Sequence, residues 1–257
     1  MERERRERKV ALVTGAAKRI GKAVALALAG KGYDLVVHYR RSRREAEQTV
    51  REIRGKGADA VPLAADLCNV KETAGLLRTT LSHYGRLDVL VNNAATYRST
   101  PWKDLVRSPR RLEEEFYRSL DTNLKGPYLL AVLAGEEMRK RAIAGQIINI
   151  GDWAQVSERP YKGYLPYHLS KAGLVALTQA LANELAPLVR VNLVANGPVE
   201  PPPGYGRRRV EEVAAATPLR RWGGTQSVAE VVLGLIACSF VTGEIIRNDG
   251  GRHLYPS

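Results

Sequence analysis

Short, nearly continuous apolar runs alternate with longer charged segments along this chain, and that alternation limits the folds it can adopt. The first run, Val10–Val13, is followed by apolar residues at helical spacing from Arg19 to Gly30. The second run, Tyr33–Tyr39, is followed by a charged segment that ends at Arg54. Short runs of this kind are typical of parallel strands covered on both faces, and the segments between them are typical of helices.

The same alternation continues to the end of the chain. Further strands are expected at Ala60–Ala64, Leu87–Val91, Gln146–Ile150, Val189–Val194 and Glu244–Arg247. Further helices are expected to end near Gly85 and to span about Lys103 to Arg141, Tyr164 to Leu185 and Ser227 to Ala237. The right-handed crossover rule then predicts an α/β fold of the Rossmann type, with a doubly wound, parallel sheet of seven strands and helices on both faces. Ligands of such sheets bind at the carboxyl ends of the strands, and the irregular stretch Asn196–Arg209 is the expected covering loop.

The length and composition favour one domain in a reducing compartment. A chain of 257 residues suits a single domain, which we place at residues 10–257 after a charged arm at residues 1–9. Cys68 and Cys238 are too few for a disulfide framework or a metal cluster, so no metal is expected. No run approaches the ~20 apolar residues of a membrane span, and the start lacks a secretory signal. We therefore expect a cytoplasmic protein without a membrane partner.

The formal charge of +13 leaves the class of partner open. Most basic clusters are interleaved with acids, as in Arg110-Arg111-Leu112-Glu113-Glu114-Glu115, which is typical of a solvated helix surface. We therefore expect no nucleic-acid partner, and the surplus positive charge suits a polyanionic cofactor. The alternative, a basic nucleic-acid binder, would show steeply salt-dependent affinity for duplex DNA.

The turn after the first strand has the composition of a phosphate-binding loop. Thr14-Gly15-Ala16-Ala17-Lys18-Arg19-Ile20-Gly21 joins a strand to a helix, where backbone N–H groups and the helix dipole hold a pyrophosphate. Gly15 permits the tight turn and Gly21 allows the helix to approach the strand. Any strand-to-helix turn can require two glycines, so the position after the first strand carries the inference.

The end of the second strand predicts which nicotinamide cofactor is used. An acidic residue there binds the ribose hydroxyls of NAD, and basic residues bind the 2′-phosphate of NADP. The chain reads His38-Tyr39-Arg40-Arg41-Ser42 with no acid before Glu45, and Asp34 lies too far back at the start of the strand. Arginine fits a phosphate by charge and geometry, so NADPH is expected. The alternative is simply a basic helix start, which the helix dipole disfavours.

A tyrosine and a lysine four positions apart predict a proton donor. Tyr167 and Lys171 share one face of a helix at this spacing. An ammonium near a phenol favours the phenolate and lowers a phenol pKa of ~10. The phenol can then give a proton to a substrate while the cofactor delivers hydride. Such a pair is common by chance, and its meaning depends on the motifs around it.

Those motifs resemble the short-chain dehydrogenase/reductase superfamily over essentially the whole chain. Matching segments, in the order of the family, are Thr14 to Gly21, Asp66-Leu67, Asn92-Asn93-Ala94-Ala95, Thr122-Asn123-Leu124, Tyr167 to Lys171, and Val241-Thr242-Gly243 through Asp249-Gly250-Gly251. The resemblance implies that Asp66 and Leu67 border the adenine and that Asn93, Ala94 and Ala95 pass beneath the cofactor. It also implies that Pro198 and Val199 contact the cofactor, that Asn123 supports a proton relay from Lys171, and that the chain forms a homotetramer.

Departures from the family pattern point to a subgroup. Asp152 holds the position of the usual catalytic serine, Arg19 replaces the middle glycine of the first motif, and the usual Pro-Gly reads Asn196-Gly197-Pro198-Val199. The first two changes occur together in pteridine reductases, which the chain also resembles in His38-Tyr39 and Arg41-Ser42. Those enzymes stack the pterin on an aromatic residue after Asn-Asn-Ala, where this chain has Tyr97. Tyr97 could instead simply pack beneath the loop.

Asp152 in place of serine also has a chemical explanation in an enzyme that reduces a pterin. A carboxyl buried near Tyr167 would have a raised pKa and could protonate a ring nitrogen, although a carboxylate could instead cap the turn that follows. The segment between Asp152 and Tyr167 is slightly longer here than in the family pattern, which leaves their geometry open.

We therefore expect an NADPH-dependent pteridine reductase acting on a dihydropterin or folate-like substrate. Arg19, Tyr97, Asp152 and Tyr167 are expected to contact that substrate. The alternatives are a carbonyl reductase, for instance of a 3-oxoacyl thioester, and a non-catalytic NADP-binding regulator.

Overall fold

Seven parallel strands form the centre of the protein, which confirms the predicted fold class. A computed structural model describes residues 8–157, 160–202 and 204–254. The strands are β1 (Val10–Val13), β2 (Asp34–Tyr39), β3 (Ala60–Ala64), β4 (Val89–Asn92), β5 (Gln146–Asp152), β6 (Arg190–Asn196) and β7 (Ile245–Asn248). Their order in the sheet is β3-β2-β1-β4-β5-β6-β7. The order reverses between β1 and β4, so the ligand crevice of a doubly wound sheet lies there.

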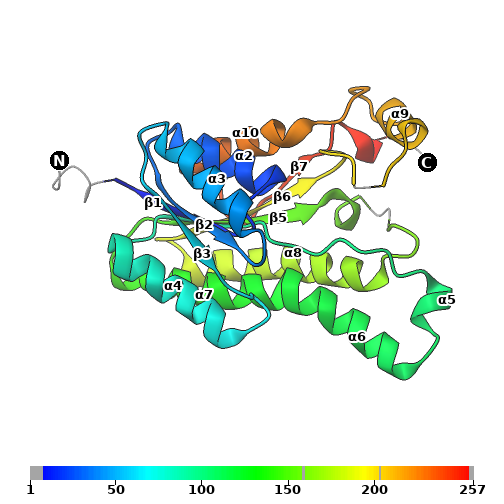
Figure 1. Cartoon of the computed structure of the whole chain (residues 1–257), viewed down its shortest axis with the longest axis horizontal. Coiled ribbons are helices and arrows are strands. Elements are labelled where there is room, and N and C mark those ends of the chain that lie inside the picture. The colour runs from blue at the N-terminus through cyan, green and yellow to red at the C-terminus, as the bar shows by residue number, and fades with distance from the viewer. Residues whose placement is uncertain (1–7, 158–159, 203, 255–257) are drawn as a thin grey trace.

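Helices cover both faces of the sheet. They are α2 (Arg19–Ala29), α3 (Arg43–Arg54), α4 (Val70–Tyr84), α5 (Trp102–Leu105), α6 (Pro109–Leu120), α7 (Gly126–Lys140), α8 (Leu165–Leu185), α9 (Arg207–Ala215) and α10 (Gly224–Ala237), with short turns η1 (Asp121–Lys125), η2 (Trp153–Gln155) and η3 (Arg252–Leu254). Figure 1 shows α2, α3 and α10 on one face and α4, α7 and α8 on the other.

The two-sided cover explains why the strands are apolar throughout. Ala11 and Val13 of β1 belong to the cluster that packs under α2 and α10, whereas Val10 and Leu12 belong to the cluster on the opposite face. All four side chains are at most 1% exposed. A strand with only one buried face would alternate apolar and polar residues, and β1 does not.

Two segments beside the ligand crevice differ from the sequence expectation. The predicted helical stretch Lys103–Arg141 divides into α5, α6, η1 and α7, because Ser108 caps α6 through the N–H of Arg111 and Pro109 occupies its first turn. The predicted irregular stretch Asn196–Arg209 is wrong at both ends: Asn196 still pairs with Asn248 as the last residue of β6, and α9 begins at Arg207.

Salt bridges from Arg207 to Glu211 and from Arg208 to Glu212 support the first turns of α9. The other predicted bounds differ from the observed ones by at most three residues.

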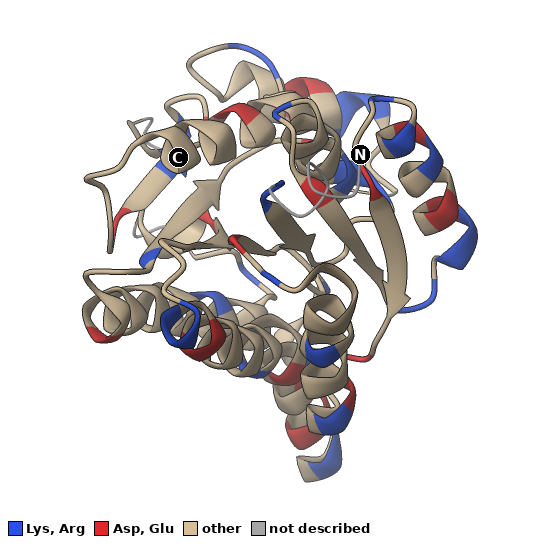
Figure 2. Ribbon diagram, turned by 90° about the vertical axis from the view of Figure 1, so that its left-hand side faces the viewer, with Lys and Arg blue, Asp and Glu red and all other residues tan. Residues whose placement is uncertain are grey.

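The surface charge is mixed, as the sequence predicts. Figure 2 shows Lys and Arg beside Asp and Glu along the outer helices. No helix within residues 8–157, 160–202 and 204–254 is long and apolar enough to cross a membrane. Most of the predicted charged arm, residues 1–7, lies outside the described residues, as do residues 255–257 of the predicted domain.

Candidate active site

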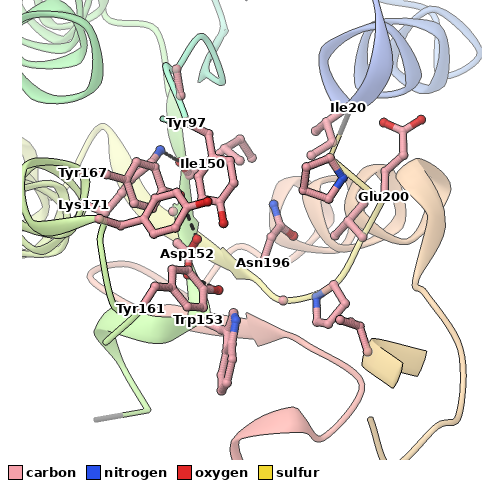
Figure 3. A pocket seen from close by; sticks show the side chains of 18 of the residues that line it. Ile20, Tyr97, Ile150, Asp152, Trp153, Tyr161, Tyr167, Lys171, Asn196 and Glu200 are labelled. Atoms are coloured by element: carbon pink, nitrogen blue, oxygen red, sulfur yellow. Dashed lines mark hydrogen bonds between the residues drawn. The ribbon is translucent and has the colours of Figure 1, made fainter. Parts of the chain in front are cut away.

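A cavity of about 520 Å³ lies at the carboxyl ends of β4, β5 and β6 (Figure 3). Predicted residues that line it are Arg19, Ile20, Asn93, Ala95, Tyr97, Asp152, Tyr167, Lys171, Pro198 and Val199. A longer groove adjoins it, and predicted residues along that groove are Gly15, Arg19, Ile20, Gly21, His38, Arg40, Arg41, Asn93, Ala94, Ala95 and Tyr97. Arg19 and Tyr97 border both hollows, so the groove and the cavity adjoin at these residues.

Tyr167 and Lys171 lie on α8 and approach the end of β5 from one side. The Tyr167 hydroxyl donates to Oδ2 of Asp152 at 2.7 Å, and Nζ of Lys171 donates to the carbonyl of Ile150 at 2.7 Å. Both side chains are buried, yet both line the cavity (Figure 3). The predicted pair is therefore brought together with Asp152, despite the longer segment between Asp152 and Tyr167.

Asp152 accepts three hydrogen bonds at the last position of β5. Its Oδ2 accepts from Tyr167, while Oδ1 accepts from the N–H of Ala154 at 2.9 Å and from the hydroxyl of Tyr161 at 3.2 Å. The bond from Ala154 is the turn cap that the sequence offered as an alternative, and it coexists with the contact to Tyr167. Burial raises the pKa of the Asp152 carboxyl, although the three donors and Lys171 oppose that rise.

The ionisation of Tyr167 differs from the sequence expectation. Burial raises the pKa of the Tyr167 phenol well above its ordinary value, and Asp152 raises it further. Burial also lowers the pKa of Lys171 from 10.5 to about 8. The expected lowering of the phenol pKa is therefore wrong for this site, because burial and the neighbouring carboxyl outweigh the ammonium. A phenol that keeps its proton suits a proton donor.

Asn123 lies beneath the site and lines neither hollow. It belongs to the π-helical turn η1 between α6 and α7, a feature often found at functional sites. Its Oδ1 accepts from the N–H of Thr96, and its Nδ2 donates to the carbonyl of Thr96 and to Oγ of Ser170. These bonds fix the loop after β4 against α8, while the support of Asn123 for a proton relay from Lys171 remains a prediction.

The turn between β1 and α2 has the shape of a phosphate cradle. Gly15 has φ +63°, in the left-handed region that glycine adopts without strain. A Cβ on Gly21 would collide with the carbonyl oxygen of Gly15 and lie 2.6 Å from Nδ2 of Asn93. The first turn of α2 contains no acidic residue and no side-chain cap, so its positive end is available to an anion. These residues fit the pyrophosphate of a dinucleotide.

Arg19 replaces a glycine at a position that suits glycine. Its φ is +54°, which is unfavourable for a residue with a side chain. The guanidinium forms a 2.6 Å ion pair with Glu200, which follows β6, and also donates to the carbonyls of Glu200 and Pro201. Arg19 therefore connects the cradle to the segment that borders the cavity.

At the end of β2, Arg40 and Arg41 are exposed to the groove, whereas His38 is buried and supports the cradle. Arg40 pairs with Asp66 at 2.8 Å. Nδ1 of His38 accepts from the N–H of Gly15, and its Nε2 lies 3.1 Å from the carbonyl of Ala65. Its imidazole thus braces the cradle, and burial lowers its pKa.

Besides Asn123, four predicted cofactor residues line neither the groove nor the cavity. Tyr39 packs against the core, Ser42 precedes α3, Leu67 is buried beside Gly126, and Asp66 reaches the groove through Arg40.

Tyr97 belongs to a group of aromatic rings on one side of the cavity. Its ring stacks on Tyr164 with centroids 4.8 Å apart and planes at 19°, and it meets Tyr167 edge-on at 5.0 Å. Tyr161 belongs to the same group, with its ring centroid 6.5 Å from that of Tyr97 and 6.3 Å from that of Trp153. Because Tyr164 covers one face of the Tyr97 ring, a flat ligand can stack only on the opposite face.

Tyr161 and Asn196 are site residues that the sequence did not predict. Tyr161 contacts Asp152, and only its position in the longer segment before Tyr167 could have indicated it. Asn196 faces Asp152 in register on β6. Its Oδ1 accepts from Asn248, while its buried Nδ2 has no partner among the residues that the structure describes. The departure from Pro-Gly had marked that position without assigning it a role. Within the described residues, no three His, Cys, Asp or Glu side chains could hold a metal ion.

Known proteins resemble this chain over nearly its whole length. A protein-family profile described as enoyl-(acyl carrier protein) reductase matches residues 15–253. A Streptomyces violaceoruber protein assigned as ketoacyl reductase 2 of the granaticin polyketide synthase is 38% identical over 252 residues, covering 96% of this chain and 97% of its own. A 3-oxoacyl-(acyl-carrier-protein) reductase of Synechocystis sp. is 36% identical over 96% of this chain and 97% of its own. The crystal structure of acetoin dehydrogenase from Enterobacter cloacae matches with TM-score 0.85 and 30% identity over 96% of each chain.

Proposed function

Because this chain belongs to the short-chain dehydrogenase/reductase superfamily, we propose that it is an NADPH-dependent carbonyl reductase that converts a ketone, such as that of a 3-oxoacyl thioester, to an alcohol. The observation that carries the proposal is the position of the Tyr167 hydroxyl at the wall of the cavity, with Lys171 on the same helix. Burial raises the pKa of this phenol, which favours its role as a proton donor. The two ketoacyl reductase relatives support a ketone over the dihydropterin that the sequence suggested.

The groove supports NADPH as the cofactor. Gly15 and Gly21 would hold the pyrophosphate, and the exposed Arg40 and Arg41 would pair with a 2′-phosphate. Arg41 forms no ion pair within the described part of the chain, so its charge is available. The cofactor, when bound, supplies the hydride.

Tyr167 and Asp152 supply the proton. A substrate oxygen in the cavity competes with Oδ2 of Asp152 for the hydrogen of Tyr167. When Asp152 is protonated, its own O–H can donate to the Tyr167 oxygen, so that the phenol hydrogen turns to the substrate. As Tyr167 gives up that proton, it takes the proton of Asp152 and never holds a full charge beside an anion. The reaction then falls in rate as pH rises through the apparent pKa of this pair.

Asn196 supports the same substrate oxygen in this proposal. A serine hydroxyl can donate to a carbonyl oxygen, whereas an ionised Asp152 has no proton to donate. On the neighbouring strand, the Nδ2 of Asn196 is a donor without a partner in the described part of the chain, and Figure 3 shows the side chain directed into the cavity. Buried donors without partners are rare, and a ligand oxygen would satisfy this one.

A dihydropterin is the second candidate substrate. Asp152 favours it, because a buried carboxyl with a raised pKa can protonate a ring nitrogen. The aromatic group around Tyr97 also suits a flat ring, but Tyr164 already covers one face of Tyr97.

One substrate panel distinguishes these candidates. NADPH oxidation is measured at 340 nm with an acetoacetyl thioester, dihydrobiopterin and dihydrofolate, with NADH in parallel. We expect turnover of the thioester with NADPH. Turnover confined to the pterins would replace the carbonyl proposal, and turnover of none of them, with cofactor binding intact, would support the non-catalytic alternative.

A further inference from the structure

Tyr161 is a second phenol on the carboxyl that contacts Tyr167. The two phenols bind different oxygens of Asp152: Tyr161 donates to Oδ1 at 3.2 Å and Tyr167 to Oδ2 at 2.7 Å. The N–H of Ala154 also donates to Oδ1, so that oxygen is held from two directions. Only Oδ2 remains for proton exchange.

Contacts from α8 fix Tyr161 in this position. Its backbone N–H donates to Nε2 of His168 at 2.7 Å, and the amide of Gln155 lies 2.8 Å from the other ring nitrogen. Burial lowers the pKa of His168, so its ring is neutral and Nε2 can accept. The Tyr161 ring also packs edge-on against Trp153 and Tyr164. A residue held by its backbone and by its ring has little freedom to withdraw its hydroxyl.

We infer that Tyr161 is a positioning residue for the reaction, because its hydroxyl occupies Oδ1 of Asp152 and turns Oδ2 alone toward Tyr167. The inference deepens the proposed function, on which it rests for the role of Asp152 in proton transfer. Burial and Asp152 both raise the pKa of the Tyr161 phenol, so its hydroxyl stays protonated and keeps its bond to Oδ1. It acts through Asp152, by stabilising the ionised carboxylate.

The groups around Asp152 determine how loss of the Tyr161 hydroxyl would change the pKa of the Asp152 carboxyl. The titratable groups that act on it are Tyr161, Tyr167, His168 and Lys171, with Tyr97 from the loop after β4. The bond from Tyr161 opposes the rise that burial causes in the pKa of Asp152. Removing one hydrogen bond to a charged group is expected to raise that pKa by about one unit.

A titration of the carboxyl without substrate tests this role separately from the proposed function. The protein is labelled with 13C at aspartate Cγ, and the Asp152 resonance is assigned as the one that Asp152→Asn removes. In Tyr161→Phe its midpoint should rise by about one pH unit. In the control Tyr205→Phe, which removes a hydroxyl from the same cavity without a bond to Asp152, the midpoint should not move.

A second variant covers the case in which Tyr161→Phe fails to fold. Tyr161→3-fluorotyrosine keeps the ring and the hydroxyl but makes the hydroxyl a stronger donor, so the midpoint should fall. If an active substrate is found, the high-pH decline of kcat should move with the midpoint in each variant. An unchanged midpoint in both variants, or an equal shift in Tyr205→Phe, would overturn the role of Tyr161, whatever the substrate panel shows.

Discussion

Lys171 gives the protein an unusual dependence of stability on pH. Burial lowers the pKa of its ammonium from 10.5 to about 8, and unfolding returns the side chain to water. Between these two pH values the unfolded chain holds more protons than the folded one, so stability rises with pH across the window. The full difference corresponds to about 3 kcal/mol, of which about 2 kcal/mol is gained between pH 7 and pH 9.5.

The variant Lys171→Met isolates this contribution, because it removes the charge and keeps an unbranched side chain. We would measure urea unfolding by circular dichroism at pH 7 and pH 9.5 and compare the free energies of unfolding. The difference between wild type and variant should move by about 2 kcal/mol in favour of the wild type at the higher pH.

Other groups that titrate in this range, such as Cys68 with its raised pKa, are present in both proteins and cancel. Lys56→Met, which removes an exposed lysine, is the control and should show no such change. An equal difference between wild type and Lys171→Met at the two pH values would show that Lys171 does not cause this pH dependence.

Four further substitutions test other parts of the site. Asp152→Asn should flatten the decline of kcat with rising pH, since an amide does not titrate; a profile identical to that of the wild type would exclude Asp152 from proton transfer. Arg41→Ala should raise KM for NADPH roughly 10- to 100-fold, the value of a hydrogen bond between charged groups, and leave KM for NADH unchanged. Gly21→Ala should abolish nucleotide binding measured by NADPH fluorescence, while far-ultraviolet circular dichroism stays native, because its Cβ would collide with Gly15; tight binding would exclude the cradle. Asn196→Ala should lower kcat/KM for the ketone roughly 2- to 10-fold, the range of one neutral hydrogen bond, and an unchanged value would exclude its amide as a donor.

Local patterns were sufficient for the fold and for part of the site. The continuous apolar run of β1 predicted a strand buried on both faces, and the glycines at 15 and 21 predicted the cradle. The buried strand and the cradle each depend on a few residues that are adjacent in the chain, so the sequence is enough to predict them. The spacing of Tyr167 and Lys171 likewise follows from the period of one helix.

The predicted pterin substrate gained no support from the comparisons, and the contacts of the residues behind it show why. Taken together, Asp152, Arg19 and Tyr97 predict a pterin site from the sequence. In three dimensions Arg19 pairs with Glu200 and Tyr97 stacks on Tyr164, so each has a protein partner as well as a place in the cavity. These partners lie far from Arg19 and Tyr97 in the chain, so the sequence did not indicate them.

The strands, the cradle and the tyrosine on its helix could be predicted from the order of residues, because each follows from residues close together in the chain. The raised pKa of that tyrosine and the contacts of Asp152 follow only from the folded arrangement. The pKa of Tyr167 depends on burial and on a carboxyl 2.7 Å away, and the second phenol, Tyr161, comes from a loop whose path the neighbouring helix fixes. Desolvation and charge pairing act through space, so no local pattern in the chain could have set their balance.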